Sequence, residues 1–86
     1  MPGYSILIKP SAVKEIESIG SKRDRQAVVS LIETLAENPR PHGCEKLSGQ
    51  EKYRLRKGRY RVVYSIKDQE LIVFVVKVGH RKDVYR

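Results

Sequence analysis

The stretch YRLRKGRYRVVY at residues 53–64 decides the fold, because it predicts two short strands and the turn between them. Glycine tolerates the positive φ that a two-residue turn demands, so Lys57 and Gly58 are predicted to form the loop. Three cross-strand pairs follow from that loop: Arg56 with Arg59, Leu55 with Tyr60, and Arg54 with Arg61.

Residues that lie opposite each other in an antiparallel pair share a face of the sheet. One face of the hairpin should therefore carry four arginines, namely Arg54, Arg56, Arg59 and Arg61. Like charges placed opposite each other destabilise a sheet by up to about 1 kcal/mol per pair, so folding gives no reason for this stacking. A polyanionic ligand would give one; the alternative is a solvated outer face. We therefore predict a phosphate-binding surface made of Arg54, Arg56, Arg59 and the turn residue Lys57.

Length and composition indicate one small domain spanning residues 1–86, with 40% hydrophobic residues to form a core. The net charge of +8 favours a polyanionic partner such as nucleic acid or an acidic protein. The lone Cys44 excludes an internal disulfide and is typical of a reducing, cytoplasmic setting. Neither a secretory signal nor an apolar run of about 20 residues is visible, so no membrane association is expected.

The rest of the chain predicts an α+β fold in the order β-α-α-β-β-β. Residues 4–9 form the first strand, residues 11–19 and 24–37 form two amphipathic helices, and residues 60–67 and 71–78 form the last two strands. Ser21 is predicted to cap the second helix. The helices should form an antiparallel hairpin packed on one face of a mostly antiparallel four-stranded sheet. Arg54, Arg56 and Arg61 are predicted on the opposite, open face.

Several kinds of catalytic site find no support in the sequence. No cysteine or histidine pair has the spacing of a metal site, and no glycine-rich phosphate loop is present, so neither metal nor cofactor is expected. The residue types that remain as candidates for a catalytic site without a metal are arginine, histidine and tyrosine. That set suits cleavage of RNA by its own 2′-hydroxyl, because arginines neutralise the phosphate while a proton moves between oxygens.

Four segments, in this order, resemble the RelE/ParE toxin superfamily of bacterial toxin–antitoxin systems. They are KLSG at residues 46–49, YRLR at 53–56, GRYRVVY at 58–64 and VGHRKDVY at 78–85. The resemblance covers nearly the whole chain and implies the fold described above. RelE-type members cut mRNA in the ribosomal A site and leave a 2′,3′-cyclic phosphate, whereas ParE-type members inhibit DNA gyrase without catalysis.

By this resemblance, Arg61, Arg81 and Tyr85 match the positions that act on the scissile phosphate. Arg54 and Arg56 stand where RelE-type enzymes often have lysines. Because arginine does not give up its proton, these two are expected to bind phosphate and not to act as the base. His80 is the candidate proton carrier, because its ordinary pKa lies near neutrality; the alternative is a solvent-exposed residue at a strand end.

The resemblance implies a toxin that is an mRNA endoribonuclease acting on the ribosome and neutralised by a cognate antitoxin. The antitoxin is expected to be acidic and partly disordered when free, and operator DNA would be bound only through the toxin–antitoxin complex. A gyrase inhibitor without catalysis is the alternative. A plain RNA-binding domain is a weaker one, because the sheet lacks a pair of exposed aromatics for stacking bases.

Overall fold

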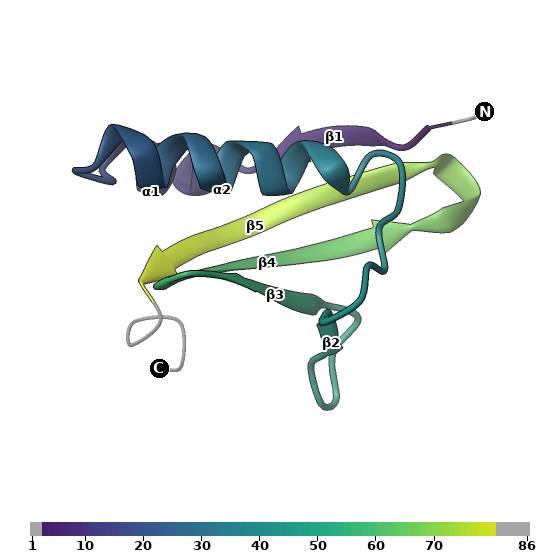
Figure 1. Ribbon diagram of the computed structural model, residues 1–86. Helices are drawn as coiled ribbons and strands as arrows, with labels where there is room; N and C mark the ends of the chain where they lie inside the picture. Colours follow the sequence, from purple (N-terminus) through teal and green to yellow (C-terminus); the bar gives the residue numbers. More distant parts are fainter. Residues whose placement is uncertain (1–2, 81–86) are drawn as a thin grey trace.

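The computed structural model describes residues 3–80, and Figure 1 shows a sheet with two helices on one side. In chain order the elements are β1 (Ser5–Ile8), α1 (Pro10–Glu17), α2 (Lys22–Thr34), β2 (Glu45–Lys46), β3 (Tyr53–Lys57), β4 (Tyr60–Lys67), the 3₁₀ helix η1 (Asp68–Glu70) and β5 (Ile72–His80). The predicted α+β class and the order of the long elements are confirmed. The predicted strand count is one too low, because two-residue β2 is too short to show a periodic pattern.

The sheet has the strand order β1-β5-β4-β3-β2. β1 runs parallel to β5, whereas the other neighbouring strands are antiparallel. The first half of β5 lies between β1 and β4, which explains its continuous apolar sequence. Beyond Val75 this flanking ends: the Lys9 N–H donates to the Val75 carbonyl at 2.8 Å, and the chain then turns into α1.

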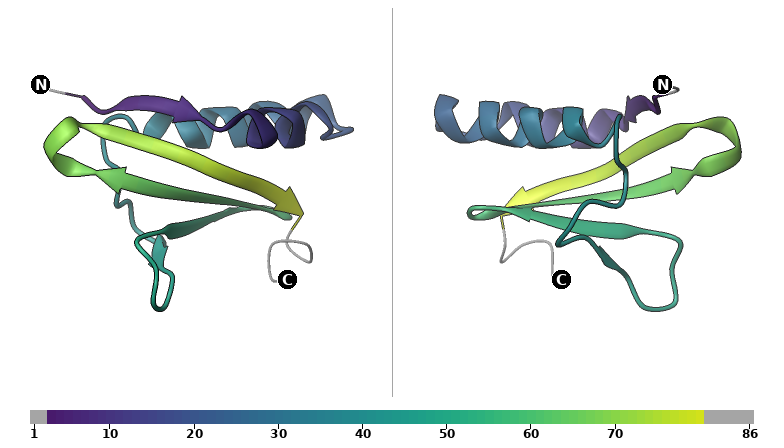
Figure 2. Two further views of the ribbon diagram at one scale, coloured as in Figure 1. Left: turned by 180° about the vertical axis from the view of Figure 1, so that it is seen from behind. Right: turned by 45° about the vertical axis from the view of Figure 1, so that its right-hand side comes forward.

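Both helices pack on the same face of the sheet, and both views in Figure 2 show this arrangement. Ser21 caps α2 as predicted, since its hydroxyl oxygen accepts a hydrogen bond from the Asp24 N–H at 3.2 Å. The helices end earlier than predicted, at Glu17 and Thr34. After Thr34 the chain forms i→i−3 hydrogen bonds, such as the one from the Glu37 N–H to the Thr34 carbonyl. The regular α-helix therefore ends before Pro39.

The core lies between the helices and the sheet. Its buried residues are Ala12, Ile16, Ile19, Val28, Ile32, Leu35, Leu55, Val62, Tyr64, Val73, Val75 and Val78. Val62 and Tyr64 therefore face the helices, with Tyr60 and Ile66 partly buried beside them. Burying each large apolar side chain contributes about 1.5–3 kcal/mol to folding.

The β3–β4 hairpin has a different turn from the predicted one. Its loop is Gly58 and Arg59, and the nearest pair is Lys57 with Tyr60. Gly58 has a φ of +58°, as the first central residue of a primed turn requires. The predicted pairs are therefore wrong, and the observed ones are Arg56 with Arg61, Leu55 with Val62, and Arg54 with Val63. Compared with the predicted pairs, each β3 residue is paired with a β4 residue two positions further along the chain. Because side chains alternate with a period of two, each strand residue stays on its predicted face, and only Arg59 moves from the strand into the loop.

A cluster of polar side chains lies at the end of the sheet that is farther from the β3–β4 turn. Arg40 donates two hydrogen bonds to Asp68 at 3.0 and 2.9 Å, and Tyr4 donates a third at 2.8 Å. The Arg40 guanidinium also lies over the Tyr53 ring, 5.3 Å from its centroid. This cluster joins the N-terminal segment, the connector after α2, β3 and the β4–β5 turn. Within the described residues, no helix is long and apolar enough to cross a membrane.

Candidate functional site

Three arginines share the face of the β3–β4 hairpin that points away from the helices. Arg56 pairs directly with Arg61, and Arg54 lies two residues along β3 on the same face. Their common face is the one predicted from the sequence. It places three guanidinium groups on neighbouring strands, held by the hydrogen-bonded hairpin and by the burial of Leu55 and Val62 on its other face.

The three arginines differ in exposure, and this corrects the expectation of an open face. Arg61 is only 1% exposed and is the one buried charged residue of the described chain. Arg56 is exposed, whereas the side chain of Arg54 is 17% exposed. Alternation along a strand predicts which face a residue occupies, but it does not predict how deeply that face is covered.

A carboxylate that the sequence analysis overlooked lies among these arginines. Glu45, on β2, pairs with Arg54 in the sheet, and its Oε1 accepts a hydrogen bond from Arg54 Nη2 at 2.8 Å. That hydrogen bond, followed by the charge of Arg54 and then those of Arg56 and Arg61, lowers the pKa of Glu45. Glu45 thus senses all three cations. We refer to Glu45, Arg54, Arg56 and Arg61 as the arginine–glutamate cluster. The sequence carries no clear signal for Glu45, because β2 has only two residues and no periodic pattern.

A groove of about 300 Å³ adjoins this cluster on the same side of the hairpin. Its lining combines basic and apolar side chains: Lys9, Leu47, Gln50, Lys52, Arg54, Val63, Val76 and Lys77. A groove lined by both cationic and apolar side chains suits a ligand that carries both negative charge and flat apolar groups. Among the predicted site residues that the structure describes, only Arg54 lines it.

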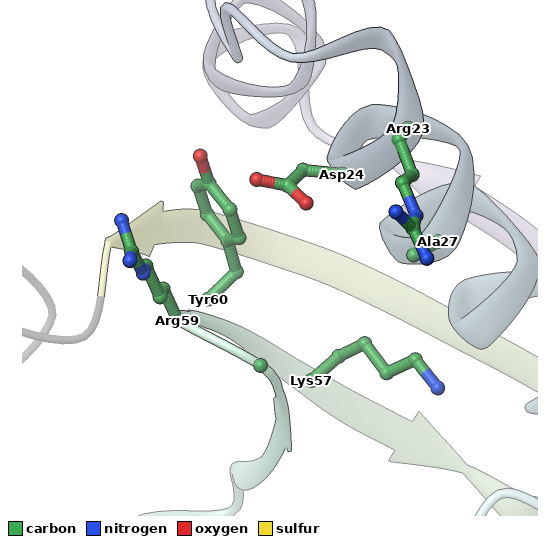
Figure 3. Close-up of a pocket in the computed structure, with 7 residues that line it drawn as sticks. Arg23, Asp24, Ala27, Lys57, Arg59 and Tyr60 are labelled. Atoms are coloured by element: carbon green, nitrogen blue, oxygen red, sulfur yellow. The ribbon is translucent and has the colours of Figure 1, made fainter.

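Lys57 and Arg59 do not join the cluster. They line a different hollow of about 550 Å³ on the helix side of the hairpin, together with Arg23 and Asp24 of α2. Figure 3 shows Tyr60 rising from the hairpin toward α2, with Asp24 beside it and Arg59 at the turn. The displaced turn explains the position of Arg59, and strand alternation explains that of Lys57.

His80 also lies apart from the three arginines. It pairs with Tyr60, whereas Arg61 pairs with Gly79, so His80 and Arg61 belong to opposite faces. The imidazole meets the Tyr60 ring edge-to-face at 5.9 Å between centroids. The proposed role of His80 as proton carrier stays a prediction, without support from proximity to the cluster. Arg81 and Tyr85 lie outside the described residues.

The arginine–glutamate cluster can bind a phosphodiester and neutralise charge that develops on it. Guanidinium groups donate in a planar fork that fits phosphate oxygens. The Glu45 carboxylate already binds Arg54, so an incoming phosphate would compete with this carboxylate for the Arg54 guanidinium. A carboxylate beside a bound phosphate is also a group that can accept a proton.

The chain is similar to known toxins along most of its length. Residues 6–85 match the family described as the ParE toxin of the type II toxin–antitoxin system parDE. The "mRNA interferase toxin RelE" of Escherichia coli strain K12 is 39% identical over 82 residues, which cover 92% of this chain and 84% of that protein.

Solved structures agree with the observed fold. The toxin–antitoxin complex RelBE of E. coli contains a chain with a TM-score of 0.69 and 36% identity, covering 90% of this chain and 95% of that one. An archaeal RelE–RelB complex from Pyrococcus horikoshii has a TM-score of 0.81 and 28% identity, with coverages of 94% and 97%. This chain therefore belongs to the RelE/ParE family of toxins from type II toxin–antitoxin systems.

Proposed function

We propose that this protein is a toxin that cuts mRNA on the ribosome and is neutralised by a cognate antitoxin. The observation that carries the proposal is the arginine–glutamate cluster: three guanidinium groups and one carboxylate on a single face, in a chain 39% identical to an mRNA interferase. A polyanion must approach this face, and the chain's net charge of +8 favours that approach. The proposed site comprises Arg54, Arg56 and Arg61 of the cluster, with Arg81 and Tyr85 added by the family resemblance.

The proposed reaction is an internal phosphoryl transfer within the mRNA. The 2′-oxygen of one ribose attacks the adjacent phosphorus, and the bond from phosphorus to the 5′-oxygen of the next nucleotide breaks. The 2′-hydroxyl proton passes to a base, and the departing 5′-oxygen gains a proton. The products are a 2′,3′-cyclic phosphate and a 5′-hydroxyl. The exposed Arg56 would donate hydrogen bonds to the phosphoryl oxygens, and the buried Arg61 would contribute its positive charge to stabilising the negative charge that develops on them.

We assign the role of proton acceptor to Glu45 in preference to His80. Glu45 shares a face with the arginines, and its lowered pKa keeps it ionised near neutrality. A phosphate bound beside Arg54 would offset part of the positive charge, which would raise the proton affinity of the carboxylate. His80 lies beside Tyr60 and would need another route to the substrate.

Replacing Glu45 by glutamine tests this assignment, because the amide keeps the shape but cannot accept the proton. We expect the cleavage rate to fall on the order of 100-fold, with the pH dependence on the acidic side lost. The opposite result, faster cleavage together with tighter RNA binding, would mean that Glu45 merely competes with phosphate. His80→Gln is the matched variant, and we expect it to change the rate less than Glu45→Gln does.

The cognate partner is proposed to be an acidic antitoxin, with mRNA and the ribosome as the targets in the cytoplasm. Relatives described as RelBE and RelE–RelB complexes support an antitoxin partner. Operator DNA would be reached only through the toxin–antitoxin complex. Charge attraction would speed the encounter with such a partner, because steering acts on association rates.

Primer extension on translating ribosomes tests the proposed function. With purified protein we expect new mRNA ends that appear only when ribosomes are present. Intact mRNA after incubation of the folded protein with translating ribosomes would contradict the proposal.

The family description as a ParE toxin favours a second candidate, inhibition of DNA gyrase. A supercoiling assay in the same protein preparation separates the two candidates. Loss of gyrase activity with intact mRNA would establish the second candidate in place of the first.

A further inference from the structure

Within residues 3–80, no strand covers the outer edge of the second half of β5. β1 pairs with β5 only as far as Val75, and the register against β4 shifts between Val63 and Tyr64. Residues 76–80 therefore continue along β4 with their outer edge facing α1. Figure 1 shows α1 and the carboxyl end of β5 at the same side of the molecule. An uncovered strand edge carries backbone groups that need other partners.

Glu15 supplies the partner at this edge. Its Oε1 accepts a hydrogen bond from the backbone N–H of Val78 at 2.9 Å, and its Oε2 accepts one from Lys77 Nζ at 3.0 Å. One carboxylate thus holds two successive residues of β5, and both oxygens are used. The contacts are half-buried, with side-chain exposures of 31% for Glu15 and 44% for Lys77. A carboxylate bound to a backbone N–H makes a stronger hydrogen bond than a neutral acceptor does.

Helix α1 fixes the position of this carboxylate. Ala12 and Ile16 of α1 are buried in the core, as is Ile19 just after the helix, and Glu15 lies one helical turn from Ala12 on the same side. Packing of these apolar residues sets the rotation of α1, so Glu15 is directed at β5 and not at solvent. Among the acidic residues of the two helices, Glu15 is therefore distinct in holding a strand that leads toward the predicted site.

We propose that Glu15 is a positioning residue, which holds the end of β5, the strand that directly precedes Arg81 and Tyr85 in the sequence. The inference rests on the proposed function and on the role proposed for those two residues. Glu15 itself need not touch substrate. A displacement of about 1 Å at a reacting group can lower a rate on the order of 100-fold, so anchoring the preceding strand has a measurable consequence.

Three variants separate the two contacts of Glu15. Glu15→Ala removes both, Glu15→Gln keeps an acceptor for Val78, and Lys77→Met removes only the ion pair. We expect Glu15→Ala to lower the maximal rate of ribosome-dependent cleavage about tenfold or more, with little change in the ribosome concentration that gives half the maximal rate. Glu15→Gln should restore the rate to within about threefold of the wild type, because the amide oxygen can still accept the hydrogen bond from the Val78 N–H, although more weakly than the carboxylate does.

Amide hydrogen exchange gives a readout that does not depend on activity. In Glu15→Ala the Val78 amide should exchange faster, whereas the amides of Val62 and Val73 in the core should keep their rates. If the wild-type protein cleaves mRNA and the Glu15→Ala variant cleaves it at the same rate, the inference is overturned. Unchanged exchange at Val78 would overturn it as well. If the wild type fails to cleave mRNA, the proposed function fails, and exchange at Val78 still decides whether Glu15 holds the strand.

Discussion

Arg56 and Arg61 lie directly opposite each other, yet they should respond differently to substitution. Arg56 is exposed, so Arg56→Ala should change the free energy of unfolding by no more than about 0.5 kcal/mol. The same change should lower the cleavage rate on the order of 100-fold, because a donor to the developing charge is lost. Urea unfolding and a cleavage assay on the same preparation measure both effects. Lys14→Ala, which removes an exposed cation from α1, is the charge-matched control.

Arg61 is 1% exposed, so its replacement by alanine should lower both activity and stability. We expect a loss of about 1 kcal/mol or more in the free energy of unfolding, since removing a large buried side chain leaves a cavity. The sequence alone treats both arginines as exposed and predicts no such difference. An Arg56→Ala variant that cleaves at the wild-type rate would exclude this guanidinium from the chemistry.

At the scale of secondary-structure elements, the polar cluster around Asp68 should make stability depend on pH. Hydrogen bonds from Arg40, and then from Tyr4, lower the pKa of the Asp68 carboxyl from 3.8 to about 2. Because the folded-state pKa is depressed, the stabilisation is fully present above about pH 4, the unfolded value, and is lost as the pH falls through about 2.

Thermal unfolding between pH 5 and pH 2 measures this contribution. Asp68→Asn should lower the unfolding temperature near neutrality and should reduce the further fall toward pH 2. Glu37→Gln, which changes an exposed carboxylate after α2, serves as the control and should leave the pH profile close to that of the wild type. If the Asp68→Asn profile runs parallel to the wild-type profile, the cluster does not couple folding to protonation.

The elements that the sequence predicts well are those with a long repeating pattern. The stripe of Val28, Ile32 and Leu35 predicts α2, and the apolar run of β5 predicts a central strand. Two-residue β2 has no pattern, so its contribution of Glu45 could not be predicted. The turn at Gly58 was displaced by one residue, because glycine fits either central position of a primed turn and only the sheet register selects one.

At the scale of the whole molecule, the excess of positive charge should make ribosome binding sensitive to salt. Each arginine that neutralises a phosphate releases condensed cations, so the affinity should fall steeply as potassium chloride rises. Arg56→Ala should reduce the slope of log affinity against log salt by about one. A binding assay across a several-fold range of salt measures the slope, and an affinity that is independent of salt would exclude the arginine face as the contact surface.

The overall architecture was more predictable than the site. Local patterns and loop lengths were enough for a helical hairpin on a mostly antiparallel sheet. The burial of Arg61, the pairing of Glu45 with Arg54 and the separation of His80 from Arg61 arise from contacts between distant segments. Such contacts leave no periodic signal in one sequence, so they appear only when the strands are assembled.

We propose that the arginine–glutamate cluster promotes attack by the 2′-hydroxyl of a ribosome-bound mRNA. Analysis of the ends of mRNA cut in single-turnover reactions tests it most directly, with wild-type protein and the Arg56→Ala variant compared at equal concentration. We expect a 2′,3′-cyclic phosphate on the upstream fragment, a 5′-hydroxyl on the downstream fragment, and a cleavage rate reduced on the order of 100-fold in the variant. A 5′-phosphate on the downstream fragment, or equal rates for the two proteins, would contradict it.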